Sequence, residues 1–197
     1  DGNSELAENV EAGRAFIIPD PRILMTELLD FFADRLKVQQ REAGVRHDLI
    51  DAVFALGGED DLVRLLARVN ALQDFVETED GADLLTAYKR AANILKKEKW
   101  EGRQTPDQVR GDDLADEEAA LVKALDSAEP KASAAVGHED FTGAMAALAS
   151  LRRPIDAFFD HVTVNDPDAA KRARRLDLLM RFRDAVHRVA DFSKIEG

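Results

Sequence analysis

The chain has 197 residues, of which 45% are apolar and 34% charged, with a formal net charge of −12 and no cysteine. This composition is typical of a folded domain with a sizeable core, and it excludes an intrinsically disordered chain, disulfide bonds and thiolate metal sites. The acidic balance also argues against a protein that coats nucleic acid with its whole surface, although local basic patches remain compatible with it.

Helical periodicity begins near the N-terminus. Asp20 and Pro21 are typical of an N-cap and a first helical position, and Gly44 is a plausible end for the helix that they begin. This helix carries an apolar stripe, which consists of Ile23, Leu24, Leu28, Phe31, Phe32 and Leu36. The stripe has the spacing of a helix face that packs against other parts of a protein.

A short second helix is predicted over residues 47–56, ending at Gly57 and Gly58. We predict a domain boundary at these glycines, with an N-terminal helical segment, residues 1–57, leading into a helical bundle, residues 58–197. Asp60 or Asp61 begins the first helix of the bundle. Further helices are expected over residues 82–99, 116–127, 138–151, 154–162 and 167–192, the last capped by Asp166.

Between two of these helices the stretch EGRQTPDQVRGDD has no periodicity and is expected to be a loop. The chain contains no alternating strand pattern of useful length, so the sequence predicts an all-α fold. No run approaches the roughly 18 apolar residues that a membrane-spanning helix needs, and no signal peptide is recognisable. We expect a cytoplasmic protein with no membrane contact. Because the sequence starts without Met, we also expect it to be part of a longer chain.

One candidate metal site is the group His47, Asp48 and Asp51, since imidazoles and carboxylates together hold the metals of phosphohydrolases. Such a site needs further histidines, but the chain has only four and none precedes His47. His47 and Asp51 lie four residues apart on a helix and can simply pair on its surface. No phosphate-binding loop, nucleophile elbow or zinc motif is present either. We therefore expect neither a metal site nor a catalytic residue.

The last predicted helix is rich in arginine, with seven basic and two acidic residues between Lys171 and Arg188. At about 100° per residue, three arginines form one row beside a row of three aspartates. The rows are Arg174, Arg181, Arg188 and Asp177, Asp184, Asp191. We expect them to form ion pairs along a solvated face. This leaves three basic residues without acidic partners, and they are candidate phosphate contacts: Lys171, Arg172 and Arg175.

A second basic face lies on the stretch AYKRAANILKKEKW. Opposite its apolar stripe, an arc of about 120° holds cations and an amide but no acidic residue. The arc consists of Lys89, Arg90, Asn93, Lys96 and Lys97, and Trp100 continues it past the helix end. These residues are candidate RNA contacts, with Asn93 or Trp100 able to meet a base. The alternative is a solvated lysine-rich face, favoured by the helix dipole, with Trp100 covering the end of the bundle.

Several stretches of the sequence together resemble one known family. They are ELLDFFADRLKVQQREAGVRHDLIDAVFAL, LLARVNALQDF, AYKRAANILKK, PIDAFFDHVTVND and RRLDLLMRFRDAVHRVADFSKIEG, in this order. They resemble the C-terminal part of the beta subunit of bacterial tetrameric glycine–tRNA ligase and span nearly the whole chain. The resemblance implies an all-helical anticodon-binding domain of the kind found in arginyl-tRNA synthetases.

The resemblance also implies partners and a division of labour. The partners are glycine tRNA and the alpha subunit of an α2β2 ligase, which charges tRNA with ATP and Mg²⁺ at a site in the alpha subunit. This chain is then a non-catalytic tRNA-recognition module that holds no cofactor of its own. The resemblance supports an RNA role for the basic face but assigns no individual contacts. The alternative is a helical domain that docks partner subunits without touching RNA.

Overall fold

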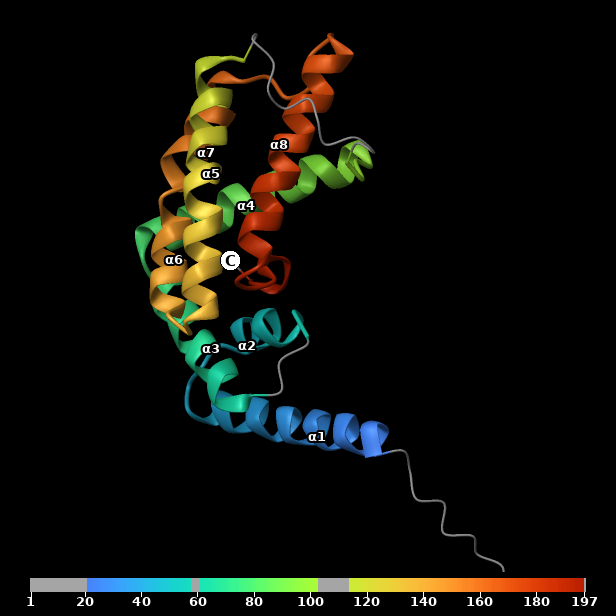
Figure 1. The fold of residues 1–197 in the computed structure, drawn as a ribbon, viewed down its shortest axis with the longest axis vertical. Coiled ribbons are helices and arrows are strands. Elements are labelled where there is room, and N and C mark those ends of the chain that lie inside the picture. Colours follow the sequence, from blue (N-terminus) through green and yellow to red (C-terminus); the bar gives the residue numbers. More distant parts are fainter. Residues whose placement is uncertain (1–20, 58–60, 103–113, 197) are drawn as a thin grey trace, which may run out of the picture. The chain divides into compact units, whose positions relative to one another are not determined.

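The computed structural model describes residues 21–57, 61–102 and 114–196, apart from the side chains of residues 21–30 and 33. Within these ranges every regular element is a helix, which confirms the predicted all-α class (Figure 1). The chain forms two compact units, Asp1–Leu36 and Lys37–Gly197. The elements are α1 (Pro21–Glu42), α2 (His47–Phe54), α3 (Leu62–Val76), α4 (Glu79–Glu98), α5 (Asp116–Gly137), α6 (Phe141–Ala149), α7 (Arg152–His161), α8 (Ala169–His187) and the 3₁₀ helix η1 (Phe192–Lys194).

The first helix begins at Pro21, as predicted, and its chain turns at Gly44 with a φ of 87°. Asp20 and the side chains of Ile23, Leu24 and Leu28 lie outside the described residues. Phe31 and Phe32 are 59% and 47% exposed, and their rings meet edge to face with centroids 5.8 Å apart. Among the described residues, these two members of the predicted stripe remain largely exposed.

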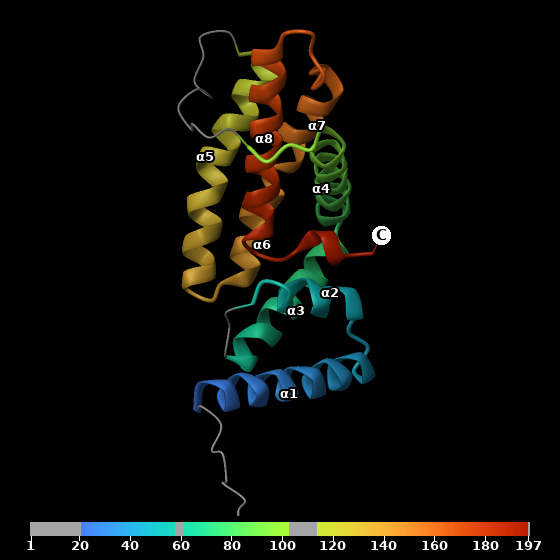
Figure 2. The same ribbon diagram turned by 90° about the vertical axis from the view of Figure 1, so that its right-hand side faces the viewer.

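In the larger unit, α8 packs against both α4 and α5, while α5 also packs on α6 and α7. Figure 2 shows α8 between α4 and α5. The core between these helices includes Phe158, Phe182 and Phe192, each fully buried. α2 packs on α3 and η1 within the same unit. The domain boundary at Gly57 and Gly58 stays a prediction, since Gly58 lies outside the described residues.

Two predicted helix boundaries near the middle of the chain are wrong. α5 continues to Gly137 instead of ending at residue 127, although it contains Pro130. A proline inside a helix removes one N–H from the ladder and crowds the carbonyl one turn back, but the alanine-rich sequence after it sustains the helix. α6 starts at Phe141 rather than at residue 138, because the Asp140 side chain caps it by accepting the Gly143 N–H at 2.8 Å.

The last helix is shorter than predicted at both ends. Asp168, not Asp166, is the N-cap, and its carboxylate accepts the N–H groups of Ala170 and Lys171 at 2.8 and 3.2 Å. At the other end α8 stops at His187, after which the chain turns back. The Asp191 N–H donates to the Ala52 carbonyl of α2 at 2.8 Å. The C-terminal segment is thereby held against α2.

None of the helices in the described ranges is long and apolar enough to cross a lipid bilayer.

The turn from α3 to α4 depends on Gly81. A Cβ at this position lies 2.0 Å from the Phe75 carbonyl oxygen and 2.7 Å from its carbon, both backbone atoms that cannot rotate away. We expect Gly81→Ala to lower the free energy of unfolding by about 2 kcal/mol or more, because the backbone must shift or α4 must start later. Urea unfolding followed by circular dichroism measures this effect.

Gly137 provides the matched control for Gly81, because a Cβ there meets nothing within 4 Å. Gly137→Ala is expected to leave stability unchanged or raise it by about 0.5–1 kcal/mol, since alanine restricts the unfolded chain more than glycine does. Equal unfolding free energies for the two variants contradict the steric role assigned to Gly81.

Candidate nucleic-acid interface

The outer face of α4 carries most of the predicted RNA contacts. Thr78 begins this helix by accepting the Gly81 N–H on its hydroxyl at 3.0 Å, and Lys99 ends it in the left-handed conformation, with a φ of 51°. The buried face consists of Leu84, Leu85, Ala87, Tyr88, Ala91 and Leu95. The opposite face leaves four of the predicted residues exposed: Arg90, Asn93, Lys96 and Lys97. We call these four residues the α4 strip.

Arg90 is held in a defined orientation at one end of the α4 strip. Its guanidinium lies over the Phe159 ring of α7, 4.3 Å from the centroid, and Nη2 is 3.5 Å from the Phe159 carbonyl oxygen. Stacking on an aromatic face suits the planar guanidinium, and the Arg90 side chain stays exposed. A planar cation presented in this way can stack on an unpaired base as well as contact a phosphate.

The beginning of α4 has the opposite charge. Arg152 of α7 is surrounded there by three carboxylates, with Asp80 at 2.9 Å, Glu79 at 3.4 Å and Asp83 in direct contact. These hydrogen bonds and charges raise the pKa of Arg152, foremost the hydrogen bond with Asp80. The basic character of α4 is therefore confined to its C-terminal half. The acidic end is electrostatically unfavourable for an anion, whereas the strip is favourable.

Two other residues predicted for this face are engaged inside the chain. Lys89 is half-buried and already takes part in an interaction within the protein. Trp100 is also half-buried, and its indole N–H donates to Asp177 Oδ1 of α8 at 2.8 Å. Since this is the only donor of an indole, Trp100 anchors the segment after α4. This contact supports the alternative in which Trp100 covers the end of the bundle.

The arginines of α8 find partners on neighbouring helices. Arg181 binds Asp126 and Glu129 of α5 at 2.7 and 2.9 Å, while Asp184, its expected partner, binds Arg183. Arg174 reaches Glu118 of α5 at 3.1 Å. For Arg181 the expected pairing along α8 is wrong, because α5 runs close enough to place its carboxylates across the interface.

The expectation that Arg172 and Arg175 lack acidic partners is also wrong. Arg172 pairs with Glu98 at the end of α4, while about two fifths of its side chain stays exposed. Lys171, the third residue of this group, is half-buried and interacts electrostatically with Asp166. Arg172 therefore lies beside the α4 strip, but its charge is shared with a carboxylate.

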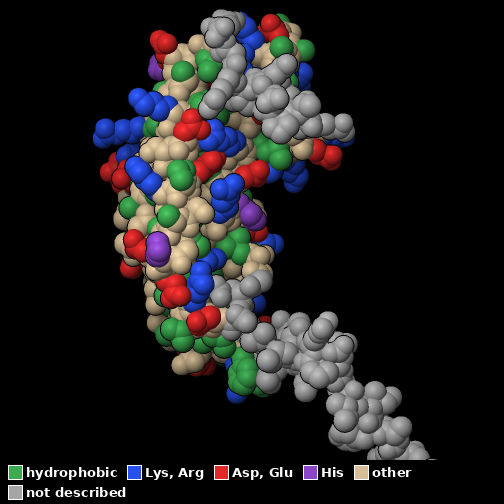
Figure 3. All heavy atoms as spheres, in the orientation of Figure 1, with side chains coloured by type: hydrophobic (Ala, Val, Ile, Leu, Met, Phe, Trp, Pro, Cys, Tyr) green, Lys and Arg blue, Asp and Glu red, His purple; other side chains and the backbone are tan. Residues whose placement is uncertain are grey.

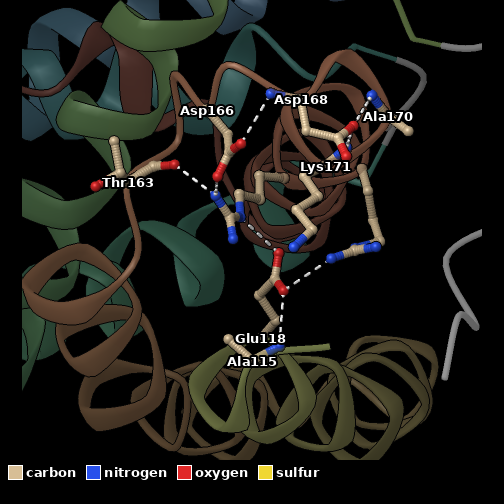
Figure 4. Close-up of polar contacts among 9 residues, drawn as sticks. Ala115, Glu118, Thr163, Asp166, Asp168, Ala170 and Lys171 are labelled. Atoms are coloured by element: carbon tan, nitrogen blue, oxygen red, sulfur yellow. Dashed lines mark hydrogen bonds and ion pairs between the residues drawn. The ribbon is translucent and has the colours of Figure 1, made fainter. Parts of the chain in front are cut away.

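Arg175 is part of a buried polar network that ties α8 to α5 and to the loop before α8. Figure 4 labels its partners Glu118, Thr163 and Asp166. Its Nε donates to Glu118 at 2.9 Å, and its Nη1 donates to Asp166 at 2.6 Å and to the Thr163 carbonyl at 2.8 Å. Only 10% of the side chain is exposed. Arg175 therefore stabilises the fold, and little of its side chain is accessible to an RNA.

Glu118 is the acidic centre of this network and is 1% exposed. Burial raises the pKa of its carboxyl group, but hydrogen bonds from the Ala115 N–H, Arg175 and Arg174 outweigh this effect, so the pKa lies below its ordinary value. The carboxylate is ionised at neutral pH and balances the arginines around it. Because the network neutralises itself, it contributes structure rather than a basic surface.

A pocket of about 190 Å³ opens where α4, the segment before α8 and the first turns of α8 meet. Lys97 and Glu98 of α4 lie at its edge, together with Arg172 of α8 and Asn165. The structure therefore brings together Lys97 and Arg172, two predicted residues that are far apart in the sequence. Asn165 and its neighbour Val164 were not predicted, since a loop residue without periodicity gives no signal in the sequence.

The His-Asp stretch has a structural role. Asp48 is 4% exposed, accepts the Glu196 N–H at 2.7 Å and forms a two-pronged bond with Arg46. Burial raises the pKa of Asp48, yet the bonds from Arg46 and the Glu196 N–H lower it more. Asp48 thus fastens the C-terminal segment to α2. In the described ranges no three or more His, Cys, Asp and Glu side chains gather as a metal site needs.

The wider surface mixes both charges. On the face shown in Figure 3, basic and acidic side chains are interleaved rather than separated into large patches. The α4 strip, which has three exposed cations and no acidic residue, is a local exception in a chain whose net charge is −12.

Comparison with known proteins finds several curated relatives of this chain. The curated relatives include the glycine–tRNA ligase beta subunits of Rhodospirillum centenum, 59% identical over 176 residues, and Phenylobacterium zucineum, 53% identical over 183 residues. A third, from Paracoccus denitrificans, is 48% identical over 190 residues. The alignments cover 87%, 91% and 94% of this chain but only 24%, 27% and 27% of the relatives, so the chain spans about a quarter of their length.

The family described as "DALR anticodon binding domain" matches residues 84–195, which run from Leu84 in α4 to Ile195, just past the end of η1. This range includes the α4 strip, the pocket and the buried network around Arg175, and it is more than half of the chain. The chain belongs to the DALR anticodon-binding domain family.

Proposed function

We propose that the chain recognises the anticodon arm of glycine tRNA within a glycine–tRNA ligase, and that the α4 strip is its main RNA contact. The observation that carries this proposal is the exposed cationic half of α4 inside an anticodon-binding domain. Among the described residues no carboxylate forms an ion pair with Lys96 or Lys97, so both are available to phosphates. The relatives that match most of the chain are named as beta subunits of this ligase.

The chemistry of the strip suits a single-stranded loop better than a duplex. Lys96 and Lys97 provide flexible point charges for phosphates, and Arg90 provides a fixed planar surface on which a base can stack. Asn93 lies between them on the same face and carries both a donor and an acceptor for a base edge. An anticodon loop offers phosphates and unstacked bases together, which is the combination that these side chains can bind.

The remainder of the ligase is part of the same proposal. The chain itself performs no catalysis and holds no cofactor, while ATP and Mg²⁺ act at the alpha subunit of an α2β2 assembly in the cytoplasm. The names of the relatives support a beta subunit and thereby an alpha-subunit partner. Recognition by this domain then serves to hold the correct tRNA while its acceptor end is charged elsewhere.

The direct test compares glycine tRNA with the same tRNA from which the anticodon arm has been removed. Filter binding at low salt is expected to show at least about tenfold weaker binding of the shortened tRNA, because most charge contacts are lost with the arm. Equal affinities for the two RNAs refute anticodon recognition. A tRNA with a truncated acceptor end is the control and is expected to bind as tightly as the intact one.

Charge reversal tests the α4 strip itself. Lys96→Glu with Lys97→Glu is expected to weaken binding of intact glycine tRNA by about tenfold or more, since two phosphate contacts become repulsive. The matched control is Lys123→Glu with Lys131→Glu, which changes the net charge equally at two exposed positions of α5. If both double variants lose the same affinity while remaining folded, general charge rather than the strip governs binding.

One observation favours protein docking as an additional role. Phe31 and Phe32 expose more than 45% of their surface side by side on α1. Exposed aromatic pairs are typical of surfaces that another protein covers. Phe31→Ser with Phe32→Ser is expected to weaken association with the alpha subunit, measured by analytical ultracentrifugation, without changing tRNA affinity. Unaltered association excludes this role for the pair.

A further inference from the structure

The four residues that follow α4 depend on α8 for their path. We call residues 99–102 the exit segment. Lys99, at its start, has a φ of 51°, which is uncommon for a residue with a side chain. Gly102, at its end, has a φ of 90°, and between them the Trp100 indole N–H donates to Asp177 of α8. The exit segment is therefore a tightly turned stretch that is held from one side by α8.

Met180 provides the second contact between α8 and the exit segment. A Cβ on Gly102 lies 3.1 Å from the Met180 sulfur and 3.4 Å from its methyl carbon, so the thioether lies directly against the glycine. Asp177 and Met180 are three residues apart and share one face of α8. Two neighbouring side chains thus hold the exit segment, one by a hydrogen bond and the other by apolar packing.

The sulfur of Met180 combines this contact with partial exposure. Met180 packs against the hydrophobic core but is only partly buried, whereas Met145 is 2% exposed. The side chain of Met25, the third methionine, lies outside the described residues. Oxidation of methionine requires that the oxidant reach the sulfur. Of the two methionines with described side chains, Met180 is therefore the one that a dissolved oxidant attacks first.

We infer that Met180 is an oxidation site, and that its conversion to the sulfoxide by hydrogen peroxide releases the exit segment from α8. The sulfur lone pair attacks one peroxide oxygen, so that an S–O bond forms and the O–O bond breaks. The departing hydroxide takes the proton of the transferred hydroxyl group and leaves as water. The sulfur loses two electrons, and the peroxide gains them.

The geometry around Gly102 makes the sulfoxide unfavourable in this contact. With the sulfur 3.1 Å from the position of a Gly102 Cβ, an added oxygen has no room on the side that faces the glycine. An oxygen that points elsewhere still makes the side chain polar, which favours its withdrawal from the apolar contact into water. The hydrogen bond between Trp100 and Asp177 then holds the exit segment without its apolar counterpart.

Peroxide treatment of the whole chain tests this inference, with Trp100 as the reporter because it is the only tryptophan. Peptide mass spectrometry is expected to show the Met180 sulfoxide forming at least about threefold faster than the Met145 sulfoxide. Over the same period the emission of Trp100 is expected to shift to longer wavelength, and its quenching by acrylamide to rise at least about twofold. A methionine sulfoxide reductase is expected to reverse both changes of Trp100.

Met180→Leu keeps the size and the apolar character of the side chain but removes the sulfur. It is expected to have the Trp100 emission of the unmodified chain before treatment and not to respond to peroxide. Met145→Leu is the matched control and is expected to respond as the unmodified chain does. The inference is wrong if Met180 is oxidised no faster than Met145, if its sulfoxide forms without a change at Trp100, or if Met180→Leu still responds. None of these outcomes bears on the proposed function, since no RNA takes part in the experiment.

Discussion

Replacing Arg175 by methionine is expected to lower the free energy of unfolding by about 3–5 kcal/mol, the usual cost of removing one partner from a buried ion pair. Methionine preserves the apolar part of the side chain, so the loss reports on the charge. Without Arg175, the carboxylate of Glu118 stays 1% exposed with Arg174 as its remaining arginine partner. The Thr163 carbonyl also loses its donor. Guanidinium unfolding followed by circular dichroism measures the difference.

Arg172→Met is the matched control, because it removes the same group from a pair that is largely at the surface. Its expected cost is below about 1 kcal/mol, as for other exposed ion pairs. Equal losses for the two variants contradict the structural importance of the Arg175 network. The same comparison separates folding from function, since Arg175→Met is expected to leave tRNA affinity unchanged under conditions in which it is folded.

The network also predicts how stability depends on pH. The pKa of Glu118 is lower in the folded chain than its ordinary value of 4.5. A depressed pKa means that the unfolded state binds the proton more readily. The contribution of Glu118 is therefore complete above pH 4.5 and is lost as the pH falls through its lower folded value. Glu118→Gln is expected to be less stable at pH 7 and to lose less further stability on acidification than the unmodified chain.

Phe192→Ala is expected to lower the free energy of unfolding by about 3–5 kcal/mol, which is typical of removing a fully buried aromatic side chain. Phe192 is 0% exposed and its ring centroid lies 5.6 Å from that of Tyr88 on α4. Its removal leaves a cavity between η1 and α4 and loosens the segment that Asp48 fastens to α2. Urea unfolding measures the loss.

The same substitution at an exposed position is the control for Phe192. Phe31→Ala, at a side chain that is 59% exposed, is expected to change stability by less than about 0.5 kcal/mol. A small effect of Phe192→Ala, comparable to that of Phe31→Ala, contradicts the assignment of the C-terminal segment to the core.

Features that depend on one helix alone, such as where it starts and which side chains it exposes, could be predicted from the sequence. The start of α1 agrees with a proline at the first helical position. The exposure of Arg90, Asn93, Lys96 and Lys97 follows from the 100° step of a helix. Helix ends were less predictable, because neighbouring signals compete. Both Asp166 and Asp168 are able to cap α8. Asp168 is the cap, because the Asp166 carboxylate is bound to Arg175.

Ion pairs between side chains of different helices could not be predicted from the sequence. Spacing along α8 predicted a pair between Arg181 and Asp184, whereas Arg181 pairs with Glu129 of α5. Arg175, which was expected to have no acidic partner, pairs with Glu118 of α5. Periodicity reports which residues share a face but not which helix will lie against it. For the same reason the pocket could not be foreseen, since Glu98, Asn165 and Arg172 meet only after α4 and α8 have packed.

The most direct test of the central claim, that the exposed cations of α4 hold the RNA, is the salt dependence of glycine tRNA binding. Each phosphate contact that is lost lowers the slope of log affinity against log salt by about one. Lys96→Gln with Lys97→Gln is therefore expected to reduce the slope by about two, while Lys123→Gln with Lys131→Gln leaves it unchanged. Equal slopes for both double variants and the unmodified chain contradict the claim.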